Sequence, residues 1–129
     1  MKRLLLVFTA AVALPLLFAA CGSDSDDAGG EGKPGAITLK MFDNSFKPNE
    51  ITVKAGSKVT FDLPNVGILP HNMHIASERG IYRESPWMSE TIGGGQTTKL
   101  EWDVPATPGK YLFRCDVHEA DMTGTITVE

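Results

Sequence analysis

Residues 111–124 constrain the fold of this chain more than any other stretch, because a strand-like pattern there runs directly into several potential metal ligands. Alternate positions hold residues that suit one buried strand face: Tyr111, Phe113 and Cys115. His118 and Met122 follow within one short turn. The pattern predicts a strand that ends in a thiol, with an imidazole and a thioether close behind it.

A thiolate, an imidazole and a thioether together suit copper, which in electron-transfer sites takes two His and one Cys with a weak axial Met. Such a set needs a second histidine, and Pro70-His71-Asn72 is the obvious source. Taken singly, a Cys or a Met is more often an ordinary core residue. The joint spacing Cys-x₂-His-x₃-Met at the end of a strand favours the copper interpretation.

Four motifs follow one another along residues 36–129: Phe46-x-Pro48-x-x-Ile51-x-Val53-x-x-Gly56, Asn65-x₄-Pro70-His71-Asn72, Tyr111-x-Phe113-x-Cys115-x-x-His118 and Met122-x-Gly124-x-Ile126-x-Val128. In this order and rough spacing, they resemble the cupredoxins, small blue-copper proteins of the plastocyanin and azurin kind. The resemblance implies one type 1 copper ion with four ligands: His71, Cys115, His118 and Met122. It also implies that Asn72 ties the two ligand segments together, and such outer-shell bonds orient ligands and tune the metal.

Two positions depart from the family pattern. Only three residues separate His118 from Met122, one fewer than in plastocyanin. Asp116 follows Cys115, where a small hydroxyl or amide-bonding residue is more usual, and it is a candidate acceptor for a hydrogen bond from Asn72. An ionised Asp116 near copper would favour Cu(II) over Cu(I).

The first 35 residues predict export and anchoring. Residues 1–20 have a basic start, an uncharged apolar run and small residues before Cys21, as a secretory signal peptide does. Phe18-Ala19-Ala20-Cys21 resembles the lipobox of bacterial lipoproteins, in which the Cys is lipidated. The alternative is an uncleaved anchor, but the run is shorter than the roughly 20 apolar residues a spanning helix needs. Residues 21–35 would then be the lipidated Cys and a flexible acidic linker.

The chain has only two cysteines, Cys21 and Cys115. Exported proteins normally pair their thiols. If lipid consumes Cys21, Cys115 is left over, and a leftover Cys is either a reactive thiol or a ligand. Ligation protects the thiol, so the count favours the copper site over a disulfide across the linker.

Short alternating segments separated by Gly and Pro turns fill residues 36–129. We expect strands over 36–41, 51–54, 58–63, 71–76, 97–104, 110–115 and 123–129. With no helical period, they predict an all-β, two-sheet Greek-key β-sandwich, the fold that the resemblance also implies.

Two local interpretations accompany this fold. In a strand over 71–76, His71 and His74 point to opposite faces, so we interpret His74 as a surface histidine and not a ligand. Residues 77–96 lack a regular pattern, and Trp87 and Met88 are expected to plug the underside of this excursion.

Charge and ligand number restrict the function. Residues 36–129 carry nine basic and twelve acidic residues, a net charge of −3 that argues against a nucleic-acid partner. We expect a monomeric, non-enzymatic electron carrier that meets cytochromes or membrane oxidoreductases transiently. It would be held by its lipid on the periplasmic or cell-surface side of a membrane. The alternatives are a copper storage or delivery protein, a copper oxidase or nitrite reductase (for which three histidines are too few), and a metal-free structural module.

Overall fold

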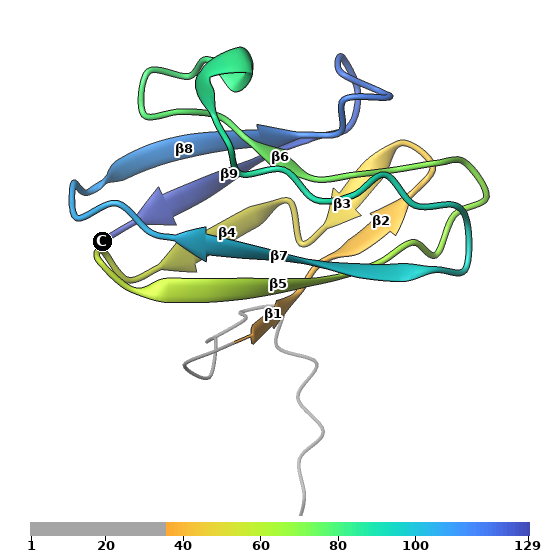
Figure 1. The fold of residues 1–129 in the computed structure, drawn as a ribbon, viewed down its shortest axis with the longest axis horizontal. Coiled ribbons are helices and arrows are strands. Elements are labelled where there is room, and N and C mark those ends of the chain that lie inside the picture. Colours follow the sequence, from red (N-terminus) through yellow and green to blue (C-terminus); the bar gives the residue numbers. More distant parts are fainter. Residues whose placement is uncertain (1–35) are drawn as a thin grey trace, which may run out of the picture.

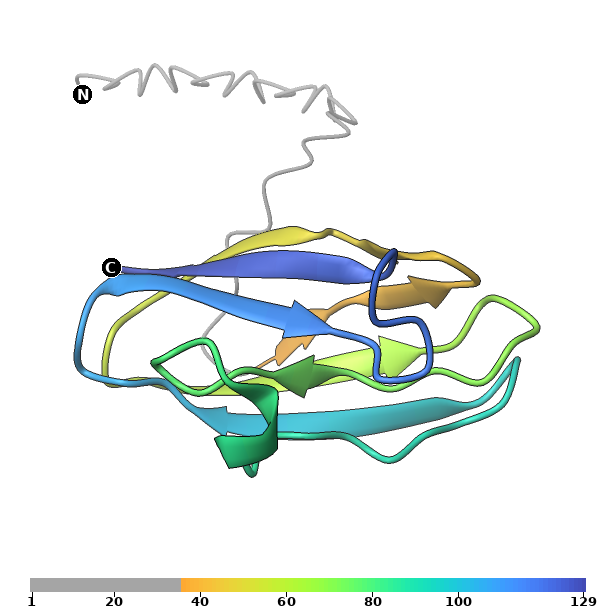
Figure 2. The same cartoon turned by 90° about the horizontal axis from the view of Figure 1, so that it is seen from above.

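Two β-sheets face each other in the computed structural model, which describes residues 36–129 (Figures 1 and 2). One sheet has the order β1 (Ala36–Thr38), β5 (Lys58–Pro64), β7 (Thr97–Asp103). The other has the order β4 (Glu50–Val53), β9 (Thr123–Val128), β8 (Gly109–Arg114), β6 (His74–Ile75). A hairpin of β2 (Lys40–Phe42) and β3 (Ser45–Lys47) completes the strands, and the predicted all-β sandwich is confirmed.

The predicted signal peptide, the Cys21 lipidation site and the linker all lie in residues 1–35, outside the described residues. Within residues 36–129, no helix is long and apolar enough to cross a membrane.

Alternation of apolar and polar residues builds the core, as the sequence predicted. In β5, Val59, Phe61 and Leu63 are buried. In β7 the buried positions are Leu100 and Trp102, which continue in phase to Val104. Because side chains alternate across a strand, each sheet turns one apolar face inward.

The predicted first strand is two strands. Residues 36–38 pair with β5, and residues 40–42 pair instead with β3. Leu39 lies between them, fully buried, and its N–H still donates to the Asp62 carbonyl at 2.9 Å. The alternation continues through Leu39, and only a change of hydrogen-bonding partner divides the strand.

The predicted strand over 71–76 is much shorter, because its backbone groups find other partners. β6 holds only His74 and Ile75, while His71 forms an isolated bridge with Ile92. The Met73 N–H donates to the Ser89 hydroxyl at 3.0 Å. Partners in residues 87–92, most of them backbone groups, thus replace a continuous ladder.

The interpretation of His74 as a surface residue is wrong. His74 is 8% exposed, because the excursion over residues 77–96 folds across the outer face of β6. Its ring packs edge-on against Tyr82 of the 3₁₀ turn η1 (Tyr82–Glu84), and its backbone bridges to Met88. Strand phase separated His74 from His71 correctly, but phase does not reveal whether an outer face is covered.

The prediction for Trp87 and Met88 holds for one of the two residues. Trp87 is partly buried and packs against the core, with its ring 6.2 Å from that of Trp102. Met88 is 53% exposed, so it plugs nothing.

Three connections gather at one end of the sandwich. In both Figure 1 and Figure 2, the β2–β3 turn, the β5–β6 connection and the β8–β9 connection lie toward the same end, away from the C-terminus. The segments that carry His71 and His118 therefore meet although they are far apart in sequence.

Candidate metal centre

Three potential metal ligands converge at this end: His71, Cys115 and His118. Their ligand atoms all lie within 4.8 Å of one another. The Cys115 Sγ is 3.7 Å from His71 Nδ1 and 3.9 Å from His118 Nδ1. The structure thus brings together three of the four predicted ligands around one point.

Cys115 is the buried member of this group at the end of β8. It is fully buried, and it is a free thiol. Its N–H donates to the Met122 carbonyl at 2.9 Å, which closes the loop between the two residues. The strand on one side and this bond on the other hold the Cys115 backbone in place.

His118 and Met122 belong to that loop. The Met122 N–H donates to the His118 carbonyl at 3.0 Å, so the segment makes one tight turn. His118 is only partly buried, whereas Met122 is fully buried in the same core cluster as Cys115. Gly124 lets β9 continue from this turn, because a Cβ there would collide with the Phe113 ring and the Asn49 carbonyl.

His71 comes from the connection between β5 and β6 and is fully buried. Its backbone exchanges two hydrogen bonds with Ile92, at 3.0 and 2.9 Å. The Asn65 amide supports the same loop by donating to the carbonyls of Leu69, at 2.8 Å, and Ile92, at 3.1 Å. Burial lowers the pKa of His71 and so favours the neutral imidazole, the form that binds metals.

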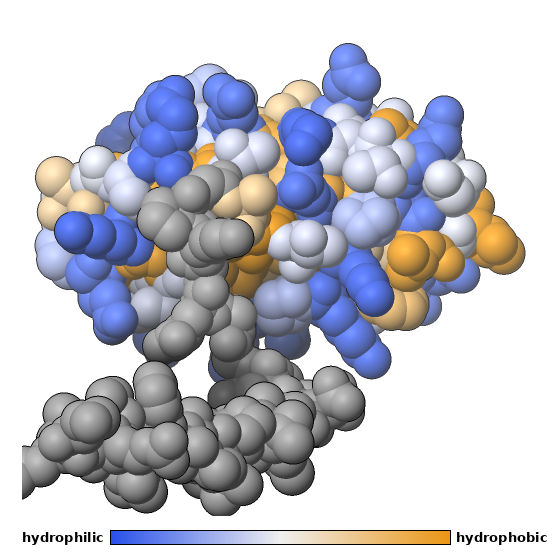
Figure 3. Space-filling view, turned by 90° about the horizontal axis from the view of Figure 1, so that it is seen from below, coloured by the Kyte–Doolittle hydropathy of each residue, from blue (hydrophilic) through white to orange (hydrophobic). Residues whose placement is uncertain are grey.

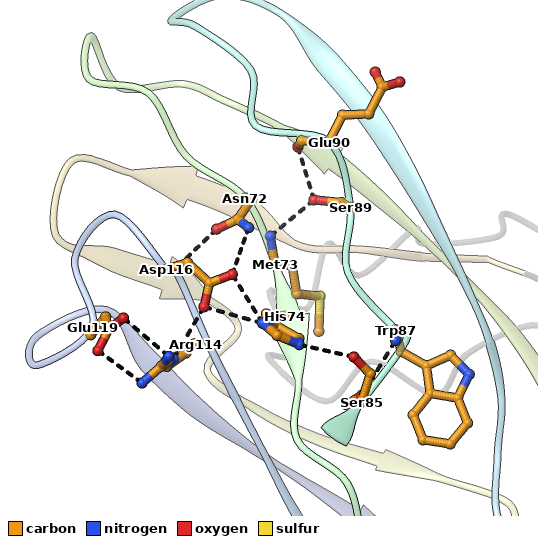
Figure 4. Close-up of polar contacts among 10 residues, drawn as sticks. All are labelled: Asn72, Met73, His74, Ser85, Trp87, Ser89, Glu90, Arg114, Asp116 and Glu119. Carbon is orange, nitrogen blue, oxygen red and sulfur yellow. Dashed lines mark hydrogen bonds and ion pairs between the residues drawn. The ribbon is translucent and has the colours of Figure 1, made fainter. Parts of the chain in front are cut away.

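Asn72 and Asp116 connect the two ligand segments directly (Figure 4). The Asn72 amide donates to Asp116 Oδ2 at 3.1 Å, and the Asp116 N–H donates to Asn72 Oδ1 at 2.9 Å. His74 Nδ1 donates to the same carboxylate at 2.9 Å. Burial opposes ionisation of Asp116, but bonds from Asn72, His74 and Arg114 outweigh it, so the pKa of this carboxyl is lowered.

Arg114 extends this network to the surface. Its Nε donates to Asp116 Oδ1 at 3.2 Å, and its two terminal nitrogens each donate to Glu119 at 3.1 Å. Its guanidinium also lies over the Tyr82 ring, 4.0 Å from the centroid. Because Glu119 lies between His118 and Met122, this fork ties the ligand loop to β8.

Sequence reasoning missed the roles of His74, Arg114 and Asp43. A signal existed for Arg114, because opposite charges at positions 114, 116 and 119 surround the thiol. No sequence signal pointed to a role for Asp43 at the site, because an Asp is expected in a turn such as the one at residues 43–45. In the structure Asp43 Oδ1 lies 3.7 Å from His71 Nε2. Backbone N–H donation from Leu69 and Ile68 lowers the pKa of this carboxyl.

The spacing of the donors leaves room for one metal ion between them. A sulfur about 2.3 Å and a nitrogen about 2.0 Å from a shared metal lie roughly 3.5–3.7 Å apart at ordinary coordination angles. The Cys115 sulfur lies 3.7 and 3.9 Å from the two histidine nitrogens, close to this range. One thiolate and two imidazoles are the equatorial donors that copper takes in electron-transfer sites.

Comparisons with known proteins point the same way. Residues 9–128 match the family described as "Cupredoxin-like domain". Amicyanin-alpha of Methylorubrum extorquens is 32% identical over 124 residues, which cover 96% of this chain and 98% of that protein. Plastocyanin of Dryopteris crassirhizoma is 34% identical over 91 residues, 65% of this chain and 87% of that protein.

Solved structures share the fold. Reduced auracyanin from Roseiflexus castenholzii superposes with a TM-score of 0.60 at 21% identity, over 75% of this chain and 98% of that one. Auracyanin A from Chloroflexus aurantiacus, described as a "blue" copper protein, has a TM-score of 0.60 at 22% identity, over 73% and 98%.

Proposed function

This chain belongs to the cupredoxin family, and we propose that it carries single electrons on one copper ion bound at the end of the sandwich. The proposed ligands are His71, Cys115, His118 and Met122. A single observation supports this most strongly: a buried free thiol faces the Nδ1 atoms of two histidines at 3.7 and 3.9 Å. When bound there, copper supplies a one-electron couple between Cu(II) and Cu(I).

The protein's contribution is to keep the ligands fixed while the charge of the site changes. Cu(II) and Cu(I) prefer different geometries, so movement of soft ligands would slow each electron transfer. Cys115 is held by β8 and by its backbone bond to Met122. The bonds between Asn72 and Asp116 hold the His71 segment against the Cys115 segment. We infer that this rigidity is what makes the site suitable for electron transfer.

Burial favours a carrier over a copper store or delivery protein. His71, Cys115 and Met122 are each fully buried, so copper would leave only after the loops open. A delivery protein needs exposed ligands that a partner can reach. The proposal is also non-enzymatic: of the three histidines, His74 is engaged with Asp116, which leaves none for a second, substrate-binding metal cluster.

We propose that partners dock at the end of the molecule that carries His118. Four exposed apolar residues lie on the two loops there: Val66, Ile68, Leu69 and Val117. In Figure 3, apolar side chains gather at the right-hand end of the view, the end where the β5–β6 connection lies in Figure 1. A small apolar face of this kind suits brief encounters that bury less than about 1,200 Å².

Export and anchoring belong to the same proposal. Residues 1–20 would act as a signal peptide, Cys21 would carry the lipid, and residues 22–35 would link the domain, residues 36–129, to the membrane surface. Mass spectrometry of the membrane fraction should then find diacylglycerol on an N-terminal Cys21. An intact Met1 would contradict this part of the proposal and leave the copper site untouched.

Voltammetry tests the carrier function itself. The copper-loaded protein should give one reversible one-electron wave per chain over repeated cycles. A copper-loaded protein that loses its metal after a few cycles would favour storage or delivery instead.

A further inference from the structure

One buried nitrogen of the site has no partner. His71 Nε2 is shielded from solvent and makes no hydrogen bond within residues 36–129. Among the buried side-chain nitrogen and oxygen atoms of these residues, only the Trp102 ring nitrogen also lacks a hydrogen-bond partner. Leaving a buried donor unsatisfied costs free energy, so an unpaired ring nitrogen beside a proposed metal site requires an explanation.

The orientation of the ring determines what this nitrogen must do. His71 Nδ1 faces the Cys115 sulfur at 3.7 Å, so Nδ1 is the nitrogen that points to the proposed copper site. A metal-binding nitrogen carries no proton, and the proton of a neutral imidazole is then on the other nitrogen. In the copper-loaded protein Nε2 is therefore an N–H donor that needs an acceptor.

The Asp43 carboxylate is the acceptor within reach. Its Oδ1 lies 3.7 Å from His71 Nε2, slightly farther than a hydrogen bond. The same oxygen accepts the N–H groups of Ile68, at 2.7 Å, and Leu69, at 3.0 Å. Those two residues precede His71 closely in the chain, so the β2–β3 turn and the His71 loop are already joined by this carboxylate.

Gly67 leaves the space that the carboxylate occupies. A Cβ at position 67 would collide with the Asp43 side chain and come within 2.9 Å of the Asp43 backbone nitrogen. The absence of a side chain at Gly67 thus permits Asp43 to lie behind the His71 ring. Two positions far apart in sequence cooperate to put a negative charge there.

We propose that Asp43 is a positioning residue for His71. Its carboxylate accepts the Nε2–H bond, fixes the tautomer that turns Nδ1 toward Cys115, and places a negative charge behind the ring that stabilises Cu(II) relative to Cu(I). This role rests on the proposed copper function. It follows the general arrangement in which a ligating histidine donates its other N–H to a carboxylate.

Three variants separate the hydrogen bond from the charge. Asp43→Asn keeps an acceptor and removes the charge, whereas Asp43→Ala removes both. Gly67→Ala keeps the charge but displaces the carboxylate. Asp121→Asn is the control, because Asp121 lies in the ligand loop and its carboxylate makes no hydrogen bond or ion pair within residues 36–129.

The first measurement is the ¹H–¹⁵N spectrum of the Cu(I)-loaded protein. It should show a slowly exchanging Nε2–H signal of His71 in the wild type and in Asp43→Asn. The signal should disappear in Asp43→Ala and in Gly67→Ala. If Asp43 only stabilised the fold, the Nε2–H signal would persist in every variant that stays folded.

The second measurement is the midpoint potential with the Cu(II) affinity. Asp43→Asn should shift the Cu(I)/Cu(II) ratio toward Cu(I) by a factor of about three to ten, tenfold being about 59 mV. Asp43→Ala should also weaken Cu(II) binding by about 10- to 100-fold. Asp121→Asn should change both quantities less.

The outcomes distinguish this inference from the proposed function. A wild-type protein that forms no copper–thiolate absorption band overturns both. A wild-type protein with the band, whose Nε2–H signal, potential and affinity are unchanged in the Asp43 variants, overturns only the role of Asp43. Equal shifts in Asp43→Asn and Asp121→Asn would also overturn it, because a general charge effect would then suffice.

Discussion

Asn72 and Asp116 exchange two hydrogen bonds across the end of the sandwich, at 3.1 and 2.9 Å, although 44 positions separate them in the sequence. Asn72 directly follows His71, and Asp116 directly follows Cys115. The pair therefore sets the separation of two proposed ligands that belong to different parts of the chain.

Removal of this pair should loosen the site. Asn72→Ala leaves the Asp116 N–H without its partner and takes one donor from the carboxylate. We expect the free energy of unfolding of the metal-free protein to fall by about 2–4 kcal/mol, because both bonds are at least partly buried. Denaturant unfolding measures this. Asn44→Ala in the exposed β2–β3 turn is the control and should cost less than about 0.5 kcal/mol.

The two histidines of the β5–β6 region should behave differently. His71→Ala should abolish the coloured copper site, because it removes a proposed ligand. His74→Ala should keep the colour but lower the free energy of unfolding by about 1–3 kcal/mol, since Asp116 loses a buried donor. Absorption spectra and unfolding curves of both variants check this. Loss of colour in His74→Ala alone would refute the ligand assignment.

Strand β9 should tolerate no side chain at its second residue. Gly124→Ala forces a Cβ against the Phe113 ring and the Asn49 carbonyl, so we expect a loss of about 1–3 kcal/mol in stability. Gly109→Ala is the matched control, because nothing lies within 4 Å of its added Cβ. Thermal unfolding of the two variants should differ clearly; equal midpoints would mean that β8 and β9 are not packed this closely.

Strand alternation predicted the sandwich, and the short spacing of Cys115 and His118 placed these two residues together, because both are local signals. The meeting with His71, 44 positions from Cys115, was predicted only through the ligand set that copper needs and the resemblance to the cupredoxins. The sequence did not predict the burial of His74 or the contact between Asp43 and His71. Both depend on which segment packs over another. The residue pattern of the excursion over 77–96 and that of the β2–β3 turn do not show which segment each one contacts. Leu39 illustrates the same limit, since its strand divides through a change of pairing and not of pattern.

Electron exchange should depend on the end that carries His118. Leu69→Lys places a like charge on both partners in self-exchange, so the rate should fall by about tenfold while the copper spectrum stays the same. Ala120→Lys, also exposed on the ligand loop, should act similarly. Leu112→Lys is the matched control, because Leu112 is 48% exposed, close to the 40% of Leu69, but lies within β8. If exchange slowed only in Leu112→Lys, the docking face would not lie at the end that carries His118.

The most direct measurement is a Cu(II) titration of the purified protein followed by visible absorption. Binding at Cys115 should give an intense sulfur-to-copper charge-transfer band that saturates at one copper ion per chain. Cys115→Ser should lose the band, whereas Cys21→Ser, which removes the only other thiol, should keep it. A folded wild-type protein whose Cu(II) complex is colourless would contradict the copper–thiolate site.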